Sequence, residues 1–239
     1  MSEPFRKRWG LFPNPEVART SAALDARQDC QRIVRLMGQY DMAWDMQRAL
    51  ELALFYTYGS DSVSTLLNRT GEFREHGQKR YDDTRLLIGH FLEAGWDSEA
   101  GAQALDRINR THAHYRIPND DYLFVLWTFI EFPLRWSQVY ARRPMTAHER
   151  EAGFNFWVEI GRRMGLSDIP PTKAAFDAFI EGYKQRHFKP CAASAQVAQD
   201  TLRVGQAWLP WPLKGLVAPV VYSLFDADAL LAERDEQGE

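Results

Sequence analysis

Residues 98–116 read SEAGAQALDRINRTHAHYR, and their pattern is the one that governs the fold of the chain. Leu105, Ile108 and His112 follow one another at spacings of three and four residues. In an α-helix this spacing places side chains on one face, whereas a strand would require alternation. Residues 98–116 are therefore predicted to form an amphipathic helix whose apolar face ends at His112.

The same periodicity extends over most of the chain. It predicts helices at about 17–37, 40–57, 60–70, 77–94, 98–116, 119–142, 146–164, 172–188, 194–208 and 212–224. Thr146 followed by Glu149 is typical of a capping box at a helix start. We therefore predict an all-α fold, a single-domain multi-helix bundle over 13–229 with flexible ends at 1–12 and 230–239.

Composition narrows the class of protein. The chain has 239 residues, 45% of them hydrophobic, which is enough for a sizeable core. A net charge of −3 gives no reason to expect nucleic-acid binding. No run of ~18 apolar residues predicts a membrane-spanning helix, and no export signal is recognised at the start. Cys30 and Cys191 are accordingly expected to be free thiols in a cytoplasmic protein rather than a disulfide.

Polar side chains interrupt an apolar stripe in the helix predicted at 77–94. Arg80, Asp83 and Thr84 lie at i, i+3 and i+4 and share one face, which Leu87 continues. Burial of charge is costly unless the charge is paired or used. The pattern leaves two interpretations open: a structural Arg80–Asp83 or Arg80–Thr84 pair, or a functional group of side chains.

His112 also has two interpretations. A histidine on an apolar face can be a hydrogen-bonded core residue or the ligand of a metal or haem, and His114 points elsewhere on the helix. The sequence contains neither His-Glu-x-x-His nor Glu-x-x-His, and it lacks Cys-x-x-Cys-His and Gly-x-Gly-x-x-Gly. A haem site needs little sequence signature beyond one imidazole on an apolar helix and a pocket opposite.

Several short segments resemble the MpaB / rubber-oxygenase family, in its small ER-bound-oxygenase-like branch. The family includes fungal ER-bound oxygenases and secreted latex-clearing proteins. The resemblance covers about residues 40–225. Its segments are KRYDDT at 79–84, RINRTH at 107–112, IPNDDYL at 117–123, FPLRW at 132–136, EIGRRMG at 159–165 and DIPPT at 168–172.

The resemblance implies a b-type haem in a globin-like helical core, with His112 as the iron ligand. Arg80 and Thr84 correspond to the family's residues on the oxygen side, where a cationic donor would stabilise charge on oxygen. Members cleave carbon–carbon double bonds of isoprenoid chains with O2. Polymer-cleaving members have a lysine just before that threonine, and Asp83 stands there in this chain, where it could act as a base or orient Arg80.

Other residues have weaker claims to a role. Glu72 is the candidate for the family's catalytic glutamate, and its alternative is a solvated loop residue. His90 is the reserve iron ligand. Five arginines are candidate partners of the haem propionates: Arg110, Arg116, Arg135, Arg142 and Arg143.

The expected function is a haem b-dependent oxygenase acting with O2 on an unsaturated hydrophobic substrate, isoprenoid- or lipid-like. The alternatives are a non-catalytic protein that binds haem or a hydrophobic ligand, and a helical interaction protein without cofactor. The apolar, proline-interrupted stretch at 207–225 is either a terminal helix docked on the core or a peripheral membrane contact.

Overall fold

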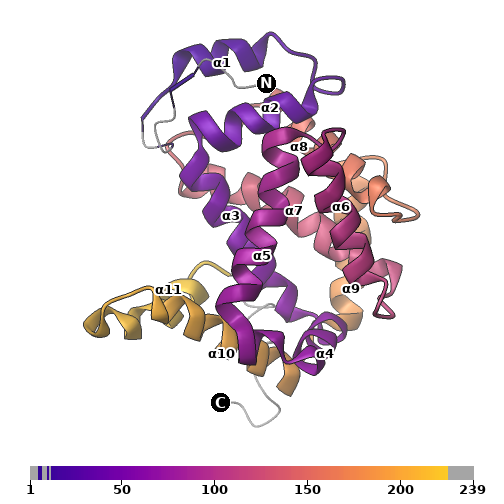
Figure 1. Cartoon of the computed structure of the whole chain (residues 1–239), viewed down its shortest axis with the longest axis vertical. Helices are drawn as coiled ribbons and strands as arrows, with labels where there is room; N and C mark the ends of the chain where they lie inside the picture. Colours follow the sequence, from indigo (N-terminus) through magenta and orange to yellow (C-terminus); the bar gives the residue numbers. More distant parts are fainter. Residues whose placement is uncertain (1–4, 7–9, 11, 226–239) are drawn as a thin grey trace. The chain divides into compact units, whose positions relative to one another are not determined.

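A computed structural model of the chain describes residues 5–6, 10 and 12–225 (Figure 1). In these residues the regular structure is helical, apart from one isolated backbone bridge between Ser60 and Phe188, so the all-α prediction is confirmed. The α-helices are α1 (Pro15–Ala22), α2 (Cys30–Leu36), α3 (Ala43–Tyr56), α4 (Asp61–Thr70), α5 (Glu72–Ala94), α6 (Glu99–His112), α7 (Asn119–Val139), α8 (Ala147–Arg163), α9 (Lys173–His187), α10 (Ala192–Ala207) and α11 (Val217–Tyr222). Shorter segments are a π-helical η1 (Met37–Asp41) and the 3₁₀ segments η2 (Thr57–Gly59) and η3 (Trp211–Leu216).

The single helix predicted at 17–37 is wrong, because the chain turns between α1 and α2. The carboxylate of Asp25 accepts hydrogen bonds from the backbone N–H groups of Arg27 and Gln28, at 2.9 and 2.8 Å. The carboxylate of Asp29 accepts one from the N–H of Asp25, at 2.9 Å. Side chains that bond nearby backbone in this way compete with the helix, and here they end it. The predicted flexible ends at 1–12 and 230–239 lie outside the described residues, apart from positions 5, 6, 10 and 12.

Packing divides the chain into two compact units, each built from two separated segments. Unit 1 draws on Met1–Ala53 and Leu86–Phe176, and unit 2 on Leu54–Arg85 and Asp177–Glu239. The boundaries fall within helices α3, α5 and α9 rather than in linkers. The extent of the domain predicted at 13–229 stays a prediction.

Unit 1 has its core along α7 and α8. Four of the five residues from Leu123 to Trp127 are buried, so α7 is enclosed on more than one side. Trp157 of α8 stacks on Phe129 of α7, with ring centroids 4.7 Å apart, and meets Phe156 edge-on at 5.3 Å. The aromatic residues of α7 therefore pack in the core.

Unit 2 has a separate core, in which α10 packs on α4. Its buried residues are Phe55, Tyr58, Val197, Ala198 and Leu202. The end of α9 is tied to the start of α4 by polar contacts. The hydroxyls of Ser60 and Tyr183 lie 2.7 Å apart, and Nδ1 of His187 lies 2.9 Å from a carboxylate oxygen of Asp61.

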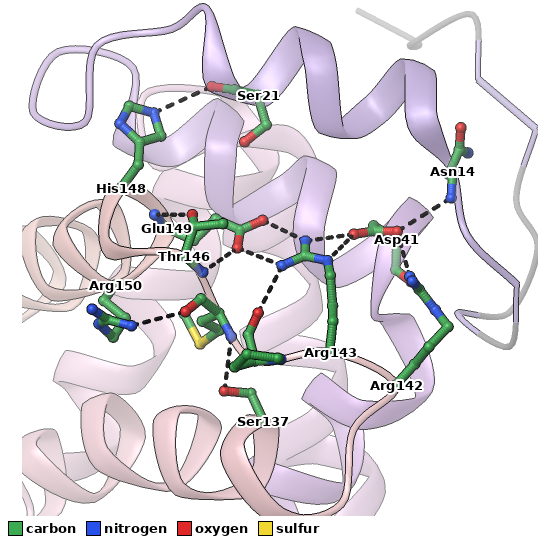
Figure 2. Close-up of polar contacts among 12 residues, drawn as sticks. Asn14, Ser21, Asp41, Ser137, Arg142, Arg143, Thr146, His148, Glu149 and Arg150 are labelled. Carbon is green, nitrogen blue, oxygen red and sulfur yellow. Dashed lines mark hydrogen bonds and ion pairs between the residues drawn. The ribbon is translucent and has the colours of Figure 1, made fainter.

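A buried charge network fixes η1 against the start of α8 in unit 1, and Figure 2 shows it. The guanidinium of Arg143 donates to Asp41 and to Glu149, each at 2.6 Å. Both carboxylates are almost inaccessible, with 4% and 6% of their side-chain surface exposed. Arg142 adds a second cation to Asp41 at 2.8 Å. Glu149 also accepts the N–H of Thr146 at 2.8 Å and so completes the predicted capping box.

Replacement of Arg143 by alanine is expected to destabilise the protein by about 3 kcal/mol, because it leaves two buried carboxylates without their shared partner. Urea unfolding followed by circular dichroism measures the effect. The control is Arg162→Ala, since Arg162 is 68% exposed in its pair with Glu159 and should cost under ~1 kcal/mol. Equal losses in the two variants would refute a stabilising role for the network.

The same network predicts acid sensitivity. Burial raises the pKa of Glu149, but hydrogen bonds from Arg143 and Thr146 outweigh it and leave the pKa below its usual value. Glu149 therefore contributes stability that is present above its unfolded pKa of about 4.3 and is lost as pH falls through the folded pKa. Unfolding free energies measured from pH 7 to pH 3 should show a shallower acid loss in Glu149→Gln. The exposed neighbour variant Glu151→Gln should follow the wild-type curve.

Candidate functional site

Helix α6 carries His112 as its last residue. Ser98 caps the start of the helix, because its hydroxyl accepts the N–H of Gly101 at 3.0 Å. Leu105 is 5% exposed, and His112 is half-buried seven residues later. His114 is exposed. The structure thus confirms that the apolar face of α6 reaches His112 and leaves His114 off it.

The imidazole of His112 lies in a partly apolar environment within unit 1. Its Nδ1 atom is buried. Its ring centroid is 5.4 Å from that of Tyr122 in α7, at a tilt of 60°. Burial raises the pKa of Tyr122, so its hydroxyl stays protonated over a wide pH range. A half-buried imidazole of this kind is a side chain that could hold haem through its iron.

Helix α5 carries Arg80, Asp83 and Thr84 in unit 2, after an irregular residue, His76, with φ −136° and ψ 32°. Nη1 of Arg80 donates to Oγ1 of Thr84 at 2.7 Å, and that hydroxyl donates to the carbonyl of Arg80 at 2.9 Å. The guanidinium carbon lies 5.9 Å from the ring centroid of Phe73. These contacts hold the half-buried Arg80 in one orientation.

Asp83 has a different partner from the one considered from the sequence. Its carboxylate accepts from Nζ of Lys79 at 2.6 Å, one helical turn away. Of the two pairs considered for Arg80, the one with Thr84 is formed. Asp83 is half-buried, whereas Lys79 has 69% of its side chain exposed. The carboxylate therefore shares the surface-facing side of α5 with a lysine.

Two of the lesser candidates are exposed. Glu72 is the first residue of α5 and His90 lies near its end, and both side chains face solvent. Exposure fits the alternative interpretation of Glu72 as a solvated residue. It also gives His90 less shielding than an iron ligand needs.

The five arginines proposed for haem propionates are mostly engaged with carboxylates in unit 1. Arg110 pairs with Asp106 and Arg135 with Glu131, each within its own helix. Arg142 and Arg143 belong to the buried network already described. Arg116 is exposed. A propionate would have to compete with a bound carboxylate at four of the five positions.

Two contacts of these helices could not be predicted from the spacing of residues. Tyr122 is separated from His112 by the turn at 113–118, and Trp208 lies 130 residues after Gln78. In unit 2 the indole N–H of Trp208 donates to Gln78 at 2.6 Å, and its ring lies 4.8 Å from that of Tyr81. Contacts between separate helices cannot be read from the spacing within one helix.

The candidates therefore form two local groups. His112 and Tyr122 meet in unit 1, while Arg80 meets Thr84 and Asp83 meets Lys79 in unit 2. Across residues 5–6, 10 and 12–225, no three or more histidine, cysteine, aspartate or glutamate side chains are grouped so that they could hold a metal ion. In the same part of the chain, no helix has both the length and the apolar character needed to cross a membrane.

Most of the chain is similar in sequence to known proteins. Residues 42–230 match the family model described as "ER-bound oxygenase mpaB/B'/Rubber oxygenase, catalytic domain". The ER-bound oxygenase mpaB of Penicillium roqueforti (strain FM164) is 28% identical over 204 residues, which are 78% of this chain and 68% of that protein. The ER-bound oxygenase mpaB' of Penicillium brevicompactum is 27% identical over 216 residues, 83% of this chain and 50% of that protein. The chain thus spans between half and about two thirds of these relatives.

Proposed function

Because this chain belongs to the ER-bound oxygenase mpaB/B' and rubber oxygenase catalytic-domain family, we propose that it is a haem b-dependent oxygenase. Membership supports an oxygenase activity. The proposal adds the cofactor and a substrate that is unsaturated and hydrophobic, of isoprenoid or lipid type, with O2 as the second substrate. The cytoplasmic location expected from the sequence stays a prediction.

The observation that carries the cofactor proposal is the half-buried imidazole of His112 at the end of the apolar face of α6. Haem, when bound, would supply an iron centre that reacts with O2. His112 would hold it through one ring nitrogen, and Tyr122 would shield the ring from water on one side. The proposal needs one protein ligand, which is what α6 offers.

Arg80 and Thr84 are proposed as the residues on the oxygen side. Their mutual hydrogen bonds fix the guanidinium before any substrate arrives, so little reorganisation is needed when negative charge develops on an oxygen atom. Asp83, whose carboxylate accepts from Nζ of Lys79 at 2.6 Å, is proposed as the group that accepts a proton. These assignments are carried by the family resemblance together with the local geometry of α5.

A second candidate is a protein that binds haem or a hydrophobic ligand without turnover. The aspartate at position 83 favours it, because polymer-cleaving members of the family have a lysine there and this chain does not. This candidate needs His112 but not the donors of α5. Both candidates therefore predict the same result in a haem titration, and a measurement of O2 uptake distinguishes them.

Haem titration of the purified protein tests the iron ligand. His112→Ala should remove most of the Soret absorbance and weaken haem binding about tenfold or more, because the axial bond is lost. His114→Ala is the matched control, since His114 lies two residues away and is exposed. A pyridine haemochrome spectrum identifies haem b. Loss of haem in His114→Ala with retention in His112→Ala would overturn the assignment.

Arg80→Ala tests turnover separately from binding. The variant should keep a normal haem content, while O2 uptake with an unsaturated lipid falls by roughly 100-fold, the typical effect of losing one charge-stabilising donor. Arg85→Ala is the control, because Arg85 is an exposed arginine of the same helix. Reversible O2 and CO binding without any uptake in the wild type would instead support the second candidate. Unchanged uptake and CO binding rates in Arg80→Ala would make Arg80 structural.

A further inference from the structure

The segment after α10 exposes a row of large apolar side chains. Trp211 is 84% exposed, Leu213 44%, Leu216 55% and Val220 56%. We call these four residues the outer row. They belong to η3 and α11, the yellow helices that follow α10 in Figure 1. Single exposed apolar residues are common on proteins, but four large ones between positions 211 and 220 favour an interaction surface.

Helical geometry aligns Leu213, Leu216 and Val220 of the outer row, whereas Trp211 lies three residues before Lys214 and stacks with that residue instead. In the 3₁₀ segment η3, residues three apart eclipse each other, which stacks Leu216 above Leu213. In α11 the next turn places Val220 on the same side as Leu216. The opposite face already has a partner, because Val217 and Val221 pack against the buried core of unit 2. A helix docked on a core normally turns a polar face to water, and this segment turns a second apolar face.

The charge pattern indicates what the outer row meets. Between residues 201 and 225 there is no aspartate or glutamate, although the whole chain has 32 acidic residues and a net charge of −3. The cations of this stretch are Arg203, which pairs with Asp200 at 2.6 Å, and the exposed Lys214. Lys214 lies between Leu213 and Leu216 in the sequence. A surface with tryptophan, leucine and lysine but no carboxylate complements anionic lipid headgroups above an acyl layer.

The size of the segment favours a position in the plane of the membrane surface. η3 and α11 together run from Trp211 to Tyr222, which is shorter than the ~20 residues that span a bilayer. Short apolar helices with interfacial tryptophan bury one face at the boundary between headgroups and acyl chains. The two relatives from Penicillium carry the description ER-bound in their names, and that description applies to those two proteins.

We propose that the outer row inserts into the surface of a bilayer containing anionic lipid, with Lys214 at the level of the phosphates. The sequence left two interpretations of this segment, a terminal helix docked on the core and a membrane contact. In this proposal both hold, because the segment uses one face for each. Val217 and Val221 hold it to unit 2, and Trp211, Leu216 and Val220 hold it to lipid. This proposal uses none of the residues assigned to haem or oxygen, so it stands independently of the proposed function.

Flotation with vesicles, without detergent, tests the proposal. Wild-type protein should float with vesicles of phosphatidylcholine and phosphatidylserine, and less with phosphatidylcholine alone. Val220→Glu should reduce the bound fraction about tenfold, because a carboxylate would enter the acyl boundary. Val139→Glu is the matched control, since Val139 is 69% exposed at the end of α7 and lies outside the row. Circular dichroism and haem titration confirm that both variants keep the fold and the cofactor site.

Trp211→Glu and Lys214→Gln separate the apolar and the charged contributions. The first should lower binding to both kinds of vesicle, and the second should lower binding only where phosphatidylserine is present. No flotation of the wild type, or equal loss in Val139→Glu and Val220→Glu, would overturn the proposal. Sedimentation velocity gives the other decisive outcome: a wild-type oligomer that Val220→Glu converts to monomer would mean that a second copy covers the row instead of lipid.

Discussion

The pairing of Arg143 with Asp41 and Glu149 is the constraint on which unit 1 depends. It joins Asp41 to a residue about one hundred positions later in the chain, and it gives two carboxylates that water hardly reaches a shared cationic partner. Glu149 caps α8 with the same side chain. The start of α8 is therefore fixed in rotation, and the aromatic residues Phe156 and Trp157 are presented to the core by that helix.

The candidate chemistry lies at helix ends and on helix faces whose orientation is set by such contacts. In α6 the capped start and the buried Leu105 determine which way His112 points. In α5 the guanidinium of Arg80 donates to the hydroxyl of Thr84, which in turn donates to the backbone carbonyl of Arg80, so the side chain is oriented along the helix. Each candidate is therefore held locally, within its own unit, before any cofactor or substrate enters.

Periodicity predicted most of this architecture because a helix repeats every few residues. It located α6 with its histidine on the apolar face, and the capping box of α8. It missed the break before α2, because the bonds made by Asp25 are a matter of side-chain geometry rather than spacing. It also missed Tyr122 beside His112, and it could not tell that Arg143 was already bound to buried acids. Contacts between helices decide those points, and one sequence does not encode them in a regular pattern.

The interleaved order of the two units bears on how the chain is made. The residues Leu54–Arg85 leave the ribosome before Leu86–Phe176, yet their packing partners begin only at Asp177. At a synthesis rate of about 5–20 residues per second, the first segment of unit 2 is complete roughly 5 to 20 seconds before synthesis of its second segment begins. During that interval the apolar residues Phe55 and Tyr58 have no core to enter. The early segment can therefore complete its packing only after the residues from Asp177 onward have been synthesised.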